Sequence, residues 1–245
     1  MDNPIPFAPA STAWAGGDAG AATAAAAVAA RTVLVAGASG LVGREILQGL
    51  LADDGVAVVH ALGRRPLGLQ HPKLRFHQVA FDHPTALAAL PPLDEAYLAL
   101  GTTIKVAGSQ EAFRAVDFAV NHAVALAARA AGAKRLGLVS AMGADARSRI
   151  FYNRVKGELE EALGALGFER LVIARPSFLA GDREALGQPV RGGEKLALRL
   201  SRWLRPVIPA NYRSIAAADV AAALLRHVPT GVGRLVLPSG AMQRS

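Results

Sequence analysis

A glycine-rich turn between a short apolar run and a helical pattern restricts the possible folds of this chain more than any other feature. Gly37, Gly40 and Gly43 directly follow the run Thr32–Ala36, and apolar residues then recur at helical spacing over Leu41–Leu51. A continuous apolar run of this length is typical of a strand buried on both faces. Glycine permits a tight turn and close approach of backbone to a ligand, and a helix start offers free N–H groups to an anion. The sequence therefore predicts a strand–turn–helix unit with an anion site at the turn.

Strand-like and helix-like segments continue to alternate along the chain. Strands are expected at Thr32–Ala36, Val56–Leu62, Leu74–Ala80, Glu95–Leu100, Arg135–Ser140, Arg170–Ala174 and Gly233–Leu237, and helices at Leu41–Leu51, Gln110–Ala131, Ile150–Leu166, Gly193–Leu204 and Ala216–His227. This alternation predicts an α/β fold: a single Rossmann domain with a doubly wound parallel sheet in the order 3-2-1-4-5-6. Ligands of such sheets bind beyond the carboxyl ends of the strands, where every motif described below falls.

Composition excludes several kinds of site. The chain has no cysteine, which excludes disulfides and thiolate chemistry, and its six histidines lack the spacing of a metal site, so no metal is expected. The formal net charge is +8, but the basic residues are scattered, which favours an ordinary basic surface. No stacking-aromatic or recognition-helix pattern accompanies that charge, so we expect no nucleic-acid partner.

The first 30 residues differ in composition from the rest. They are rich in Ala, Gly, Ser, Thr and Pro, and contain no arginine. A secretory signal needs a basic start and a strongly apolar centre, and a mitochondrial presequence is rich in arginine. We therefore expect a disordered tail over 1–30, a dinucleotide-binding domain over 31–245 with a small C-terminal region that covers the substrate, a cytoplasmic location and no integral membrane segment.

The turn after the first strand is expected to hold the pyrophosphate of a dinucleotide through Gly37, Ser39, Gly40, Leu41, Val42 and Gly43. No Asp or Glu lies between Gly55 and Phe81, where a site for unphosphorylated NAD usually has an acid for the ribose hydroxyl. Arg64 and Arg65 stand there instead, and guanidinium groups bind phosphate well, which favours NADP over NAD. The alternative is that both arginines are ordinary surface residues.

Two further segments complete the expected cofactor site. Asp82 follows the third strand and is either an acceptor for the adenine amino group or a helix cap. Gly101, Thr102 and Thr103 follow the fourth strand, where the glycine permits close approach of the cofactor and the threonines can donate hydrogen bonds.

Tyr152 and Lys156 are the candidate catalytic pair. Their four-residue spacing in a predicted helix puts both side chains on one face. A nearby ammonium favours tyrosinate and lowers the pKa of a tyrosine toward the working range, as a general acid or base requires. Ser140 ends the preceding strand and can donate a hydrogen bond to a substrate oxygen.

Taken together, these motifs resemble the short-chain dehydrogenase/reductase superfamily. The segments Gly37–Gly43, Leu100–Thr103, Ser140–Ala144, Tyr152–Glu158 and Arg175–Ser177 look like its atypical, epimerase-like branch, and most like the Tat-interacting-protein-type oxidoreductases and their bacterial relatives. The likeness extends from about Arg31 to the C-terminus. It implies that Ser140, Tyr152 and Lys156 are catalytic and that Pro176, Ser177 and Phe178 flank a nicotinamide. It leaves open whether Asn121 or Asp117 corresponds to the helical asparagine of the superfamily.

The sequence thus favours an NADPH-dependent oxidoreductase that transfers hydride to or from a small carbonyl or alcohol. Two alternatives stay open: a non-catalytic NADP(H)-binding sensor or scaffold, and a nucleotide-sugar epimerase-like enzyme. The expected partner is a small-molecule substrate. A homodimer through the alanine-rich helices Gln110–Ala131 and Ile150–Leu166 is a further hypothesis.

Overall fold

A computed structural model of the protein describes residues 30–81, 87, 90–180 and 209–243. Its strands are β1 (Arg31–Ala36), β2 (Val56–Gly63), β3 (Leu74–Gln78), β4 (Glu95–Leu98), β5 (Arg135–Val139), β6 (Arg170–Arg175), β7 (Leu179–Ala180), β8 (Ile215–Ala216) and β9 (Gly233–Pro238). Its helices are α1 (Leu41–Ala52), α2 (Ile104–Ala107), α3 (Gln110–Arg114), the π-helix η2 (Ala115–Val120), α4 (Asn121–Ala130), α5 (Phe151–Gly164), the 3₁₀-helix η3 (Ala210–Tyr212), α7 (Ala217–His227) and α8 (Ser239–Met242).

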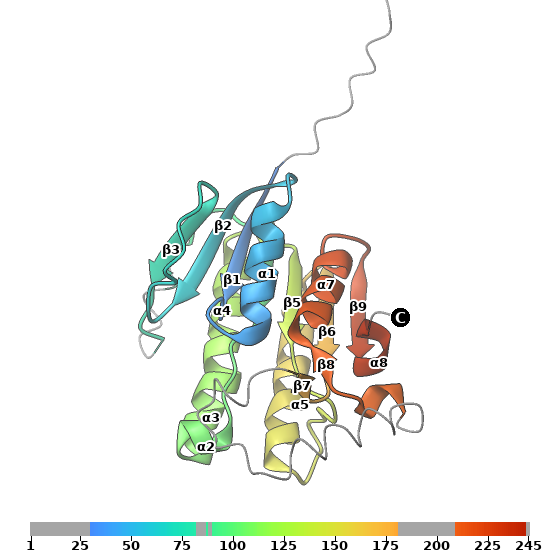
Figure 1. The fold of residues 1–245 in the computed structure, drawn as a ribbon. Helices are drawn as coiled ribbons and strands as arrows, with labels where there is room; N and C mark the ends of the chain where they lie inside the picture. Colours follow the sequence, from blue (N-terminus) through green and yellow to red (C-terminus); the bar gives the residue numbers. More distant parts are fainter. Residues whose placement is uncertain (1–29, 82–86, 88–89, 181–208, 244–245) are drawn as a thin grey trace, which may run out of the picture.

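Seven strands form one parallel sheet in the order β3-β2-β1-β4-β5-β6-β9. The predicted order 3-2-1-4-5-6 is confirmed, and β9 extends the sheet beyond β6. Because all seven strands run the same way, their carboxyl ends meet at one edge, which is the lower edge in Figure 1. A separate pair, β7 with β8, joins the segment after β6 to the segment before α7.

Apolar side chains cover both faces of the sheet, which is why the strands are continuous apolar runs in the sequence. Val33 and Val35 pack toward the cluster that contains buried residues of α1 and α7, whereas Leu34 and Ala36 pack toward the cluster formed with α4 and α5. Successive side chains of a strand point to opposite faces, so a strand covered on both sides must be apolar at every position. Burial of a side chain such as the fully buried Leu34 contributes about 2 kcal/mol.

The long helix expected at Gln110–Ala131 is present, but it is not uniform. It consists of α3, the six-residue π-helix η2 and α4 in unbroken succession. A π segment widens the helix locally and often lies at a functional site. Asp117 and Asn121, in and just after this segment, are both fully buried.

A charged cluster closes the opposite edge of the sheet, where the strands begin. Glu95 on β4 is fully buried and accepts hydrogen bonds from Arg31 Nη1 at 3.0 and 2.9 Å and from the hydroxyl of Tyr97 at 3.2 Å. Asp53 binds the same guanidinium. These contacts satisfy a carboxylate that would otherwise be costly to bury.

Several expectations fall on residues that the structure does not describe. They are the predicted tail, apart from Ala30, the expected adenine acceptor Asp82 and the helix expected at Gly193–Leu204. Within the described ranges, no helix combines the length and the apolar character needed to span a bilayer. The same ranges contain no group of three or more His, Asp or Glu side chains arranged to hold a metal ion.

Candidate functional site

The glycine turn presses closely against the end of β4. Gly37 has φ of +90°, and a Cβ atom at this position would lie 2.5 Å from the carbonyl carbon of Ala99. A Cβ at Gly43 would lie 2.0 Å from the carbonyl oxygen of Gly37. Neither position has room for a side chain, so both glycines are required for the turn to pack between β1, α1 and β4.

The outer surface of this turn is open. Ser39 and Gly40 are exposed, whereas Val42 and Gly43 are buried. Helix α1 begins directly after Gly40, and no side chain caps its first N–H groups. The first N–H groups of a helix have no intrahelical partner and favour an anion. The turn therefore has the geometry of a phosphate site.

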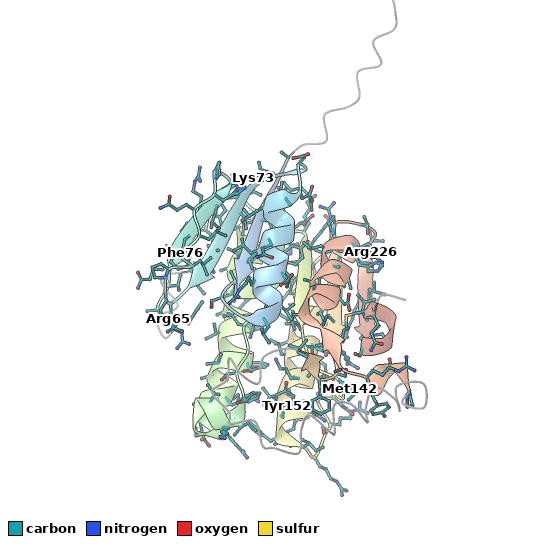
Figure 2. The ribbon with its side chains drawn as sticks, viewed as in Figure 1. Arg65, Lys73, Phe76, Met142, Tyr152 and Arg226 are labelled. Atoms are coloured by element: carbon teal, nitrogen blue, oxygen red, sulfur yellow. The ribbon has the colours of Figure 1, made fainter. Side chains whose placement is uncertain are left out.

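Arg64 and Arg65 directly follow the end of β2, and both are exposed. The carbonyl oxygen of Arg64 accepts a hydrogen bond from Gln78 Nε2 at 3.2 Å, which ties this corner to β3. Figure 2 shows Arg65 below Lys73 and Phe76, at the end of β2 that points toward the part of the molecule where Met142 and Tyr152 lie. Asp82, the expected adenine acceptor, lies outside the described residues.

The segment after β4 lies directly over the candidate catalytic residues. A Cβ at Gly101 would lie 3.5 Å from Asp117 Oδ1 and 3.8 Å from Lys156 Nζ. The backbone N–H of Thr102 donates to Asp117 Oδ2 at 2.9 Å. Thr103 caps α2, because its hydroxyl oxygen accepts from the N–H of Val106 at 3.2 Å. Gly101 and Thr102 thus contact the site, whereas the Thr103 oxygen is engaged in a helix cap.

Tyr152 and Lys156 lie together in the first turns of α5, as their spacing predicts, but the lysine also has a buried counter-ion. Lys156 is 4 % exposed, and its Nζ lies 2.7 Å from Oδ1 of the fully buried Asp117. The Tyr152 ring packs against Phe113, with ring centroids 5.3 Å apart. Burial raises the pKa of Tyr152, the Lys156 ammonium lowers it, and the Asp117 carboxylate raises it further. The net direction is upward, which corrects the expected downward shift.

Ser140 lies where β5 ends and is almost fully buried. Its hydroxyl donates to Glu160 Oε1 at 2.6 Å. The same carboxylate accepts from Arg175 Nε at 3.0 Å and from Arg175 Nη2 at 2.6 Å. The single proton of Ser140 is therefore directed at Glu160, and a contact between this hydroxyl and a substrate stays a prediction.

The three residues after β6 differ in burial and in their hydrogen-bond partners. Pro176 is buried, and its carbonyl oxygen accepts from the N–H of Met142 at 2.9 Å. Ser177 donates its hydroxyl to the carbonyl oxygen of Arg213 and lies 2.9 Å from the hydroxyl of Ser239. Phe178 is 72 % exposed. Pro176 is thus tied to the loop after β5, whereas Ser177 is turned toward the C-terminal segment.

Two acidic residues of the site were not assigned a role from the sequence. Asp117 had been an open alternative to Asn121, and only the three-dimensional structure shows that it reaches Lys156. Glu160 had a recognisable signal, because it lies four residues after Lys156 on the same face of α5. Asn121 Nδ2 shares its two protons among the carbonyl oxygens of Leu100, Val116 and Asp117, which lie 3.2 to 3.3 Å away, and so links the end of β4 to the π segment.

Solved structures with this fold include nucleotide-sugar enzymes and dehydrogenases. The *Bordetella bronchiseptica* enzyme WbmH, solved with NAD⁺, has a TM-score of 0.62 and 18% identity over 86% of this chain and 76% of its own. A *Burkholderia cenocepacia* short-chain dehydrogenase, solved with NADP, has a TM-score of 0.62 and 16% identity over 87% and 90% of the two chains. At these identities the likeness shows the fold alone, which this chain shares with short-chain dehydrogenases and epimerase-like NAD-binding proteins.

Relatives with similar sequences identify the family of this chain, although no family model matches the sequence. The mitochondrial protein fmp52 of *Emericella nidulans* is 38% identical over 159 residues, which cover 62% of this chain and 68% of the relative. FMP52 of *Coccidioides immitis* is 37% identical over 166 residues, with the same coverage of the two chains. The chain belongs to the Fmp52 family.

The expected cytoplasmic location is wrong by this comparison. The fungal relatives, including FMP52-1 of *Scheffersomyces stipitis*, are named as mitochondrial proteins. The prediction relies on the absence of arginine before Arg31. In this family, the lack of an arginine-rich N-terminal segment does not predict a cytoplasmic location.

Proposed function

We propose that the protein is an NADP(H)-dependent oxidoreductase that acts on a small carbonyl or alcohol. The observation that carries the proposal is the half-buried Tyr152 beside the buried Lys156, which lies beneath Gly101 at the edge of the sheet where the glycine turn opens. A sensor or scaffold needs no tyrosine beside a buried lysine, whereas proton transfer does.

The residues present fit a phosphorylated dinucleotide. The uncapped start of α1 and the exposed Ser39 suit a pyrophosphate. The exposed Arg64 and Arg65 suit a further phosphate on the ribose, because a guanidinium binds phosphate through two parallel hydrogen bonds. Gly101 leaves open the space above Lys156 that a side chain would occupy.

The side chains divide the proposed chemistry between them. A nicotinamide bound at this edge supplies or accepts the hydride. Tyr152 moves a proton at Oη, and Lys156 holds a ribose hydroxyl while its charge acts on Tyr152. Pro176, whose carbonyl oxygen accepts from the N–H of Met142, is proposed to flank the nicotinamide. Ser140 remains the predicted hydrogen-bond donor to the substrate oxygen. In this role its hydroxyl must rotate so that its proton points away from Glu160 and toward the substrate.

Calorimetric titration with NADPH and NADH tests the proposal. We expect the protein to prefer NADPH, and the double variant Arg64→Ala/Arg65→Ala to lose at least about tenfold in NADPH affinity while changing NADH affinity little. Arg75→Ala is the matched control, because Arg75 is exposed but directs Nη1 at the carbonyl oxygens of Pro72 and Leu74. If the protein binds neither nucleotide, the proposal is wrong.

Turnover separates an enzyme from a sensor. A screen of small aldehydes and ketones with NADPH, followed by loss of NADPH absorbance, should identify a substrate. Tyr152→Phe should then reduce kcat by about 100-fold or more without preventing nucleotide binding. Tight nucleotide binding with no turnover on any carbonyl tested, and no effect of Tyr152→Phe, would favour the sensor.

A further inference from the structure

Lys156 is held by a carboxylate that no motif identified in advance. Asp117 Oδ1 lies 2.7 Å from Lys156 Nζ, and Asp117 Oδ2 accepts from the N–H of Thr102 at 2.9 Å. Both charged side chains are at least 95% buried, so water does not solvate either charge to a useful extent. A buried ion pair of this kind compensates both charges, and the loss of one partner leaves the other uncompensated.

We propose that Asp117 is a positioning residue that holds Lys156 and offsets part of its charge, so that Tyr152 stays a neutral phenol and the site is set to reduce a carbonyl. This inference rests on the proposed function, because it assigns a direction to the same site. The carboxylate does not touch the reacting atoms. It acts through Lys156 and through the field at Tyr152.

The surroundings of Tyr152 support this role. From α3, the apolar ring of Phe113 packs against the phenol. The charged groups that act on it among the described residues are Lys156 on its own helix and Asp117 on η2. Burial favours the neutral phenol, and the Asp117 carboxylate opposes the lowering of the pKa of Tyr152 by the Lys156 ammonium. The pKa of Tyr152 is accordingly raised despite the nearby ammonium.

A neutral phenol suits one direction of the reaction. In reduction, a bound NADPH provides the hydride and its electron pair to the carbonyl carbon, the C=O π bond breaks, and the Tyr152 proton passes to the oxygen. The products are an alcohol and the oxidised dinucleotide, and water returns a proton to Tyr152. Oxidation of an alcohol instead needs a tyrosinate to accept a proton, which the raised pKa of Tyr152 disfavours near neutral pH.

The ionisation of Tyr152 can be followed without substrate or cofactor. The chain has three tyrosines, so the tyrosinate absorbance of the full-length protein minus that of Tyr152→Phe reports Tyr152 alone. We expect Asp117→Asn to lower the pKa of Tyr152 by about one pH unit or more, and Lys156→Met to raise it. Asp94→Asn is the control, because Asp94 is exposed and binds the N–H of Thr32 where the strands begin. It should change nothing.

A purely structural role for Asp117 predicts a different pattern. An unchanged or higher pKa of Tyr152 in a folded Asp117→Asn protein would overturn the proposal. If Asp117→Asn does not fold, Lys156→Met is compared with Lys156→Met/Asp117→Asn, which leaves no buried cation. The double variant must titrate at lower pH, and equal titration overturns the inference.

The pH dependence of carbonyl reduction should shift in the same direction as the pKa of Tyr152. In Asp117→Asn, the alkaline limit of carbonyl reduction should move to lower pH, because the phenol loses its proton earlier. Failure of nucleotide binding would refute the proposed function but leave the absorbance titration interpretable. Normal turnover with an unshifted titration would refute the role of Asp117 alone.

Discussion

At the scale of single residues, the cost of a left-handed backbone conformation can be separated by experiment from the cost of a steric clash in the glycine turn. Gly37 and Gly68 both have positive φ, +90° and +64°. A Cβ at Gly37 would meet the backbone of Ala99 at 2.5 Å, whereas a Cβ at Gly68 would meet no atom within 4 Å. We expect Gly68→Ala to lower the free energy of unfolding by about 1 to 2 kcal/mol from conformation alone. Gly37→Ala should cost about 3 kcal/mol or more, because backbone must also move.

Urea denaturation of the two variants measures this difference. Equal losses would mean that the turn can relax away from β4, and the close packing of the glycine turn against Ala99 would then not be required for folding.

Glu160 offers a second comparison between neighbouring residues. Its buried carboxylate binds Ser140 and Arg175, whereas Glu161 is exposed. Glu160→Ala should lower the free energy of unfolding by about 3 kcal/mol, because it leaves Arg175 without its partner. Glu161→Ala should change it by less than about 0.5 kcal/mol. Thermal and chemical unfolding of both variants would show this, and a similar small effect of both would mean that Arg175 readily finds water instead.

At the scale of elements, a histidine pair links β2 and β3 and should make stability depend on pH. His60 Nδ1 lies 2.8 Å from His77 Nε2, and His60 is only 9% exposed. Burial, and then the charges of His77 and Arg75, lower the pKa of His60 below its usual value of 6.5. The unfolded chain therefore binds more protons, so the stabilisation is complete above about pH 6.5 and is lost as pH falls toward the folded pKa.

Urea unfolding at about pH 7.5 and about pH 5 tests this sign. We expect the wild-type protein to lose stability on acidification, and His60→Gln to lose less. His122→Gln, a substitution on α4 outside the pair, should behave as wild type. A larger acid loss in His60→Gln than in wild type would contradict the prediction.

Most elements could be predicted from the sequence because their burial is local and repetitive. The strands buried on both faces and the glycine turn are visible in short windows, and β1 through β6 were found with small errors at their ends. The π-helix could not be predicted, because Ala115–Val120 has an ordinary helical composition. The hydrogen bond of Asn121 to Leu100, at the end of β4, joins residues 21 positions apart and is likewise not visible in a short window.

The site was predicted only where its residues lie close in sequence. Tyr152 and Lys156 share one helix, and their spacing identifies them. The contact of Asp117 with Lys156 joins segments 39 positions apart, and the direction of the Ser140 hydroxyl depends on Glu160, 20 positions away. No local pattern specifies such contacts, so the predicted pKa direction of Tyr152 was wrong, and its catalytic role stays a prediction.

At the scale of the whole molecule, we propose that two copies associate through the alanine-rich surface of α4. A groove of about 350 Å³ lies there, and the side chains of its lining residues are all apolar: Leu87, Leu90, Ala123, Leu126, Ala127, Ala130 and Ala131. Leu126 projects from it with 46% exposure. Small side chains permit close approach of two helices, and exposed apolar area of this kind favours association.

Light scattering measures the mass directly. We expect the wild-type protein to have the mass of a dimer, and Leu126→Asp to have that of a monomer with an unchanged circular dichroism spectrum, because a carboxylate at a helix contact must be desolvated. Val232→Asp is the matched control, since Val232 is 79% exposed and precedes β9, away from α4. A monomeric wild type, or equal dissociation by both substitutions, would show that α4 is not the contact surface. A monomeric Leu126→Asp that still binds NADPH would show in addition that each protomer holds a complete site.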